Sequence, residues 1–300
     1  MDSIDSITLN FNDQNIFILN LSLAFIMFGV AMQLKLSDFK LILSNPVGAI
    51  AGILSQFIVL PVLTFVLIWV IEPHPTFALG MMMVAACPGG NISNFFSATS
   101  KGNIALSVSL TAISSVLAIF MTPFNLSFWA SNYPPTAELL TEVNLNIGDV
   151  FQTILIILGI PIVLGMFIRY KYPSTTVKLH PYMHYASILI FAAIVILAFS
   201  ANFDIFIHYI YLVVLLVFVH NAVAFVSGYQ IGRIFRLPTA DRRTLAIETG
   251  IQNSGLGLLL IFAFFKGLGG MAIVAAWWGI WHIIAGLTVS YFWKNKVISA

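Results

Sequence analysis

The sequence predicts an all-helical protein that crosses a membrane several times. Hydrophobic residues make up 60% of its 300 residues and charged residues only 8%, whereas a soluble domain carries roughly 25% charged residues. The mean hydropathy is +0.99, and the apolar residues gather in runs long enough to cross the hydrocarbon core. The net charge of +2 is too small to indicate a nucleic-acid partner. The single cysteine, Cys87, excludes an intrachain disulfide and a paired-thiol redox site.

Nine apolar segments reach the length of about 20 residues that a helix needs to span a bilayer. The stretch before the first segment is polar and acidic and has no basic residue, so it does not resemble a cleaved signal peptide. In chain order, the predicted spans cover about residues 15–33, 45–71, 75–100, 103–130, 148–168, 182–201, 207–234, 241–266 and 270–293.

The basic residues predict the orientation of the chain, because Lys and Arg accumulate in cytoplasmic loops. With the N-terminus outside, Lys266 is the one basic residue of the thirteen that falls on the outer side. The outer loops carry Glu72, Glu138, Glu142 and Asp204 instead. One span more or fewer would place basic and acidic residues together on both sides of the membrane. We therefore expect nine spans with the C-terminus in the cytoplasm. The basic residues on the inner side are Lys35, Lys40, Lys101, Arg169, Lys171, Lys178, Arg233, Arg236, Arg242, Arg243, Lys294 and Lys296.

Two of the nine spans contain residues that interrupt a helix. The third span carries the run CPGGNISN at 87–94, in which proline lacks a backbone donor and glycine loses much entropy in a helix. The eighth span carries QNSG at 252–255, between the glycines at 250 and 257. Non-helical backbone at membrane depth persists only where it is buried in protein or lines a cavity. Both interruptions fall near the middle of the membrane and therefore predict a binding site there.

The two interruptions occupy matching places in the two halves of the chain. Each lies about 70 residues after the start of the first span or of the sixth span, and the two spans run in opposite directions. This spacing predicts an inverted repeat in which spans one to four correspond to spans six to nine. The alternative is that proline and glycine only kink two packed helices.

Glu248 is a lone carboxylate within the eighth span. It lies on the order of 10 Å from the inner end of that span, at about 1.5 Å per helical residue, and Lys and Arg are confined to span ends and loops. An ionisable group at this depth needs a partner or a water-filled cavity. A bound cation is therefore the first candidate for that partner, which predicts a cation-coupled transporter.

The residue types at the two interruptions suit a small hard cation such as Na⁺, which prefers oxygen ligands. Carbonyls freed by unwinding and half-helix C-termini favour cations, whereas half-helix N-termini favour an anionic group of a substrate. One carboxylate with two monovalent cations leaves a charge of about +1, which an organic anion would neutralise. Amides also join helices in membranes without binding any ion. The oxygen-bearing side chains are Asn91, Ser93, Asn94, Glu248, Gln252, Asn253 and Ser254.

The sequence resembles the bile acid:sodium symporter family over nearly its whole length, from MFG at 27–29 through LSDF at 36–39 to the last span. The most specific motifs are CPGGNISN at 87–94, KGNIALS at 101–107 and ETGIQNS at 248–254, which occur in this order.

The resemblance implies one transmembrane domain over residues 1–300, in which a panel moves against a core that contains two crossing broken helices. The panel would comprise about residues 15–33 and 148–201, and the core about 45–130 and 207–293. Some bacterial members carry an extra N-terminal helix. We expect this chain to lack it, as the vertebrate bile acid carriers do, so that its repeats hold four and five spans.

The resemblance also implies two sodium sites behind the crossing and a substrate site at its front. The first sodium site would use Ser93, Asn94, Ser107, Thr111 and Glu248. The second would use the side chains of Gln56, Glu248 and Gln252 and the carbonyls of Thr249 and Ile251. The substrate would meet Asn91, Asn253, Ser254 and His282. Ser107 and Thr111 could instead bond to carbonyls of their own helix, and His282 could lie at the membrane interface.

These features predict a sodium-coupled symporter that imports an organic anion, such as a bile acid or a smaller organic acid, by alternating access. We expect two coupling Na⁺ ions, a multi-pass location in the bacterial inner membrane, and no nucleic-acid or protein partner. The alternative is a proton-coupled carrier of a small organic acid in which Glu248 titrates. An enzyme is disfavoured because the sequence shows no nucleophile, metal cluster or acid–base pair. The midplane interruptions disfavour a channel, and the lack of a soluble signalling domain disfavours a receptor.

Overall fold

Helices make up nearly all of the described chain in the computed structural model, which covers residues 13–35, 37, 46–142, 147–201, 203–265 and 267–295. The α3, η3 and α4 segments are continuous, so they form one rod. In chain order the helices are α1 (Asp13–Ala31), α3 (Pro46–Leu54), η3 (Ser55–Val59), α4 (Leu60–Ile71), α5 (Pro75–Ala86), α6 (Ser93–Thr99), α7 (Ile104–Asn132), α8 (Pro134–Glu142), α9 (Ile147–Lys171), α10 (Pro173–Ala201), α11 (Phe203–Ile234), α12 (Thr239–Gly250), α13 (Ser254–Phe264) and α14 (Gly269–Lys294).

Each predicted span coincides with one helix, with the α3–η3–α4 rod, or with a pair of helices. Among the described residues, five helices are long and apolar enough to cross a membrane, and three shorter ones are also apolar. The number of crossings and the inverted repeat stay predictions. Lys40, Lys266 and Lys296, which were used to predict the orientation, lie outside the described residues, as do residues 36, 38 and 39 of the LSDF run. The five long apolar helices are Pro46–Ile71, Ile104–Asn132, Ile154–Lys171, Tyr209–Ile234 and Gly269–Lys294.

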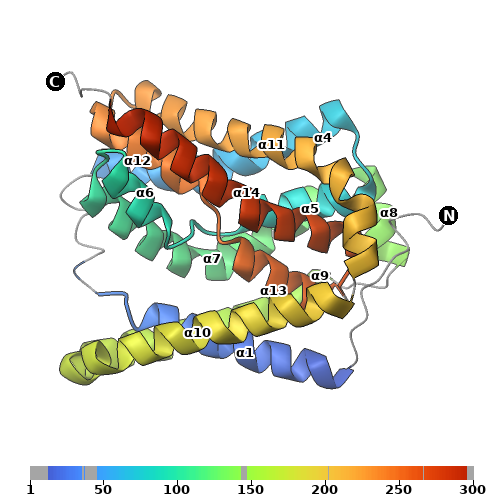
Figure 1. The fold of residues 1–300 in the computed structure, drawn as a ribbon, viewed down its shortest axis with the longest axis horizontal. Coiled ribbons are helices and arrows are strands. Elements are labelled where there is room, and N and C mark those ends of the chain that lie inside the picture. Colours follow the sequence, from blue (N-terminus) through green and yellow to red (C-terminus); the bar gives the residue numbers. More distant parts are fainter. Residues whose placement is uncertain are drawn as a thin grey trace.

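The helices form two groups along the long axis of the molecule. Helices α1 and α10 lie along one side, and α4 and α11 lie along the opposite side (Figure 1). Helix α1 packs against α9 and α10, whereas α11 packs against α12 and α14. Helices α7 and α13 connect the groups, because α7 contacts α9 and α13 contacts α1. The division into a moving panel and a core stays a prediction.

The surface between the helix ends is apolar, as expected of a protein surrounded by lipid. Val70, Val163, Leu215 and Leu287 are each more than half exposed. In contrast, α5 is buried on all sides from Thr76 to Ala86, as expected of an apolar helix in the centre of a bundle. The most buried helix therefore leads directly into the first interruption.

Both predicted interruptions are confirmed, and the two unwound segments cross each other. Helix α5 ends at Ala86 and α6 begins at Ser93, while α12 ends at Gly250 and α13 begins at Ser254. Gly89 and Gln252 form an antiparallel bridge. The amide of Gly90 donates to the carbonyl of Ile251 at 2.8 Å. In return, the amide of Asn253 donates to the carbonyl of Pro88 at 2.8 Å. The two breaks thus satisfy part of each other's backbone hydrogen bonding.

Candidate functional site

Glycine permits the close approach of the two segments. A Cβ atom on Gly89 would lie 2.9 Å from the Glu248 Oε2 atom, and one on Gly90 would lie 3.1 Å from the Gln252 carbonyl oxygen. Neither glycine has a positive φ, so the limited space rather than backbone strain favours glycine here. The Pro-Gly-Gly run therefore both ends α5 and brings the backbone against the Glu248 carboxylate.

Glu248 is the centre of a buried cluster of oxygen atoms. Its Oε1 atom accepts hydrogen bonds from the hydroxyls of Ser93 and Ser107, each at 2.5 Å. The Thr111 hydroxyl lies 3.2 Å from Oε1 and 3.1 Å from Oε2, and it lies 3.5 Å from Asn94 Oδ1. Within the described part of the chain, no basic side chain pairs with Glu248. The structure therefore brings together all five residues predicted for the first sodium site.

Three helices supply this cluster. Ser93 is the first residue of α6, Glu248 lies on α12, and Ser107 and Thr111 are one turn apart on the same face of α7. The Asn103 side chain caps α7 by accepting from the Leu106 amide at 3.1 Å. The Thr111 hydroxyl also donates to the Ser107 carbonyl at 3.0 Å. The alternative prediction, that Thr111 bonds to a carbonyl of its own helix, is therefore confirmed, although the same hydroxyl also lies close to Glu248.

The second predicted cluster is formed mainly by two amides. Gln56 Nε2 donates to Gln252 Oε1 at 2.8 Å, and Gln252 Nε2 faces Gln56 Oε1 at 3.2 Å. The Thr249 carbonyl accepts from Gln252 Nε2 at 2.7 Å, and the Ile251 carbonyl accepts from Gly90. A carbonyl oxygen has two lone pairs, so each of these carbonyls can accept one further contact.

A cavity of about 10 Å³ lies between Gln56 and Glu248. This volume suits a single small guest, such as a water molecule or a dehydrated alkali ion. Its polar lining atoms come from the two clusters and from Ser114. The full lining is Gly52, Ile53, Gln56, Leu110, Ser114 and Glu248.

The donor set suits a hard monovalent cation. The side chains that contact the Glu248 carboxylate among the described residues do so through hydroxyl oxygens, and oxygens are the ligands that such ions prefer. The described residues include no group of three or more His, Cys, Asp or Glu residues that could hold a transition metal. One carboxylate among neutral hydroxyls and amides therefore fits Na⁺ better than a divalent transition metal.

Sequence reasoning missed three side chains that complete the hydrogen bonding of the breaks. Thr122 donates to the Ala86 carbonyl at 2.7 Å, and Asn221 donates to the Gly250 carbonyl at 2.7 Å. The hydroxyls of Ser55 and Thr249 lie 2.7 Å apart. The available signal was the presence of polar side chains inside apolar spans, where they join helices. Their partners could not be inferred, because all three contacts are distant in sequence.

Within the described part of the chain, no hydrogen bond joins the four residues predicted to meet the substrate, so their shared site stays a prediction. Asn91 is exposed at the crossing, while Asn253 caps α13 by accepting from the Leu256 amide at 3.0 Å. Ser254 faces α14, where a Cβ on Gly279 would lie 3.0 Å from its hydroxyl oxygen. His282 follows Gly279 by one turn and is 6% exposed. Its Nδ1 atom has no hydrogen-bond partner among the described residues.

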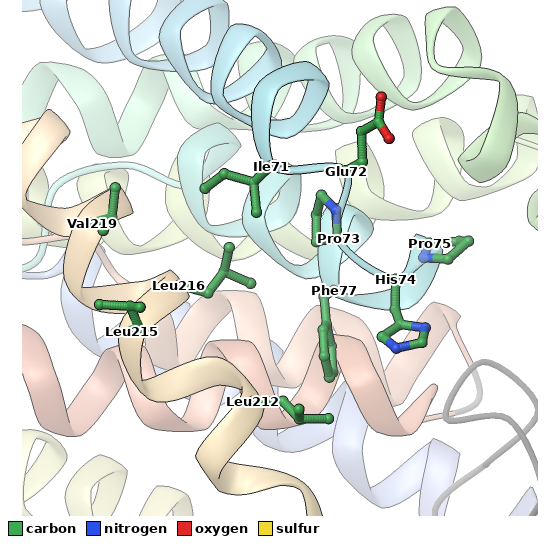
Figure 2. Close-up of a pocket in the computed structure, with 10 residues that line it drawn as sticks. All are labelled: Ile71, Glu72, Pro73, His74, Pro75, Phe77, Leu212, Leu215, Leu216 and Val219. Carbon is green, nitrogen blue, oxygen red and sulfur yellow. The ribbon is translucent and has the colours of Figure 1, made fainter.

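A larger hollow lies away from the crossing. Figure 2 shows a cavity of about 600 Å³ between the α4–α5 turn and α11, with Glu72 and His74 at its rim and leucines on the α11 side. None of the predicted site residues lines this cavity. The complete lining is Ile71, Glu72, Pro73, His74, Pro75, Phe77, Leu212, Leu215, Leu216 and Val219.

Comparison with known proteins gives the same family as the motifs. The sequence model of the Sodium Bile acid symporter family matches residues 20–209. The chain is 30% identical to the "Uncharacterized sodium-dependent transporter YocS" of Bacillus subtilis, over 92% of this chain and 82% of that protein.

Relatives also come from plants and animals. The "Probable sodium/metabolite cotransporter BASS1, chloroplastic" of Arabidopsis thaliana is 30% identical over 90% of this chain and 65% of its own length. The human "Ileal sodium/bile acid cotransporter" is 29% identical over 80% of this chain and 67% of its own length. The chain thus spans less than two thirds of the Arabidopsis relative.

Proposed function

The chain belongs to the sodium bile acid symporter family, whose members are sodium-dependent transporters, and from this premise we propose that it is a symporter that uses Na⁺ to import an organic anion. The observation that supports this most strongly is the buried oxygen cluster around Glu248, formed where two broken helices cross. A buried carboxylate without a basic partner is stabilised by a cation that neutralises it.

The first ion would be held by Ser93, Asn94, Ser107, Thr111 and Glu248. The hydroxyl groups that donate to the carboxylate can rotate and present lone pairs instead. Binding here links α6, α7 and α12, so occupancy of the site stabilises the crossing of the two broken helices. The ion supplies positive charge beside the crossing, which makes the site more favourable for an anion.

The second ion would be held by Gln56, Gln252, Glu248 and the carbonyls of Thr249 and Ile251. Gln56 and Gln252 hydrogen-bond to each other, so binding would replace this pairing by contacts from both Oε1 atoms to the ion. The cavity of about 10 Å³ beside Gln56 and Glu248 supports this position. Because Glu248 belongs to both sets, occupancy of one site would change the affinity of the other.

The substrate class is an organic anion, for which a bile acid is the first compound to try. The names of the relatives support this class, since they describe bile acid and metabolite cotransporters. The N-terminus of α13 begins at the crossing, and a helix N-terminus favours negative charge. We assign the substrate contacts to Asn91, Asn253 and Ser254, with His282 on the neighbouring helix.

Transport would proceed by movement of α1, α9 and α10 against the remaining helices. We place the protein in the bacterial inner membrane with nine spans, the N-terminus outside and the C-terminus in the cytoplasm, as the basic residues indicate. Sodium binding from outside would complete the anion site, and the rearrangement would then open that site to the cytoplasm.

Uptake of taurocholate into proteoliposomes tests the proposal. An inward sodium gradient should drive uptake, an equal potassium gradient should not, and Glu248→Gln should abolish the difference. Uptake that follows a pH gradient and ignores sodium would contradict sodium coupling. Uptake driven by sodium only for smaller organic acids would keep the coupling and exclude the bile acid.

A further inference from the structure

The rod formed by α3, η3 and α4 contains a π-turn beside the crossing. Over Ser55–Val59 the helix widens, and the Leu60 amide donates to the Ser55 carbonyl five residues earlier. An isolated π-turn within an α-helix is rare and often occurs at a functional site. This one is located where the rod supplies Gln56 to the second predicted cluster.

The π-turn directs the consecutive side chains of Ser55 and Gln56 toward the region where the two broken helices cross. The Ser55 hydroxyl contacts the Thr249 hydroxyl at 2.7 Å, while Gln56 contacts Gln252 at 2.8 Å and the Cys87 carbonyl at 2.7 Å. In a regular helix, consecutive side chains point about 100° apart. The wider turn therefore allows the rod to present two adjacent polar side chains to the broken helices.

Pro61 leaves one carbonyl of this turn without its usual partner. In a regular α-helix the Phe57 carbonyl would accept from the amide of residue 61, but proline has no N–H. Phe57 is buried, with 1% of its surface exposed. A buried carbonyl without a donor costs about as much as a lost hydrogen bond.

Asn125 of α7 supplies a donor to this carbonyl. Its Nδ2 atom donates to the Phe57 carbonyl at 3.1 Å, and its Oδ1 atom accepts from the Trp129 indole at 3.2 Å. The Asn125 side chain is 4% exposed, so water does not compete for these bonds. The two contacts fix the orientation of the amide.

We infer that Asn125 is a positioning residue for the second cation site: it holds the π-turn that presents Gln56. This role rests on the proposed function, because it assumes that Gln56 binds a cation. Helix α7 then serves both ion sites. Ser107 and Thr111 contact Glu248 directly, and Asn125, about 20 Å further along the same helix, acts through Gln56.

Sodium-dependent thermal stability of the purified protein tests this role without requiring a known substrate. The melting temperature is measured against NaCl at constant ionic strength, with KCl as the replacement salt. Asn125→Ala should raise the sodium concentration at half-maximal stabilisation by on the order of tenfold. The control Asn132→Ala removes a bond of the same kind, from Asn132 Nδ2 to the Phe128 carbonyl at the exposed surface, and should leave this midpoint unchanged.

A double-mutant cycle separates positioning from a general loss of stability. If Asn125 acts through Gln56, then Asn125→Ala has no further effect on the sodium midpoint in a Gln56→Ala background. Asn125→Ser removes the same donor with a smaller loss of polarity and replaces Asn125→Ala if that variant does not fold.

The melting measurements can contradict the positioning role of Asn125 and the proposed sodium coupling separately. A wild-type midpoint in both Asn125 variants, with only a lower melting temperature in KCl, overturns the positioning role. A wild-type protein that sodium stabilises no more than potassium does contradicts the proposed function itself.

Discussion

Glu248 shows how a single carboxylate is accommodated inside an apolar bundle. The hydroxyls of Ser93 and Ser107 donate to it, and the Thr111 hydroxyl lies 3.1 Å from its Oε2 atom. Hydrogen bonding to a charged acceptor partly offsets the cost of burial. Hydroxyls are suited to this position because they can donate to the carboxylate and also offer lone pairs to a cation. A basic side chain in the same place would neutralise Glu248 permanently and leave no role for an ion.

Thr111 provides the most conservative test of this cluster. Thr111→Val keeps the shape of the side chain and removes the hydroxyl that lies within 3.2 Å of both Glu248 oxygens. We expect the apparent sodium affinity to fall by on the order of tenfold, because a hydrogen bond to a charged group contributes about 1.5–3 kcal/mol. The measurement is the sodium dependence of uptake or of the melting temperature.

Thr141→Val is the matched control for Thr111. Its hydroxyl donates to the Ala137 carbonyl of α8 at an exposed position. An equal loss of sodium affinity in both variants would contradict the special role of Thr111.

Gly89 tests the close approach of the backbone to the carboxylate. In Gly89→Ala the new Cβ would lie 2.9 Å from Glu248 Oε2, closer than carbon and oxygen normally approach. We expect loss of sodium-driven uptake with the protein still in the membrane, measured as uptake per amount of inserted protein. Gly159→Ala, where the nearest atom would be 3.4 Å away, should retain uptake; if Gly89→Ala retains it too, the packing argument is wrong.

At the scale of helices, the breaks are stabilised by donors from their neighbours. Ala86, Cys87 and Gly250 each have a carbonyl that accepts from a side chain of another helix. Non-helical backbone can therefore persist at membrane depth. The same contacts restrict the angles at which the broken helices can cross.

Asn221→Ala should destabilise the second break. It leaves the Gly250 carbonyl, which accepts from Asn221 Nδ2 at 2.7 Å, without that donor in a buried site. We expect a loss of roughly 1–3 kcal/mol of stability, seen as a lower melting temperature in KCl. An unchanged melting temperature would indicate that another donor replaces Asn221.

The two breaks could be predicted from sequence, whereas the π-turn could not. Proline and two glycines in CPGGNISN cannot continue a helix, so the position of the first break followed from local chemistry. Pro61 gave no comparable signal, because a proline in a membrane helix more often produces a kink. The π-turn contacts Asn125, which is distant in sequence, and no local pattern encodes that contact.

The site residues also divide into those that motifs could predict and those that depend on the arrangement of whole helices. Ser93, Ser107, Thr111 and Glu248 were predicted from the family resemblance, and the structure brings them into contact. Asn91, Asn253, Ser254 and His282 were predicted together, but no hydrogen bond joins them in the described residues. A substrate cavity depends on how whole helices are arranged, which motif spacing does not determine.

For the whole molecule, the proposed coupling to two cations would make transport sensitive to the membrane potential. Two Na⁺ ions with one monovalent anion move one net positive charge inward, and a potential of 100 mV then contributes about 2.3 kcal/mol per cycle. We expect a negative-inside potassium diffusion potential to stimulate sodium-driven uptake in proteoliposomes. Uptake that is independent of the potential would contradict this stoichiometry.

The measurement that tests the central claim most directly is equilibrium binding of radioactive sodium to the purified protein, with Glu248→Gln in parallel. We predict saturable binding of two sodium ions per chain that excess potassium does not displace, and loss of this binding in Glu248→Gln. A wild-type protein that binds no sodium, or a Glu248→Gln variant that binds it as the wild type does, would contradict the account.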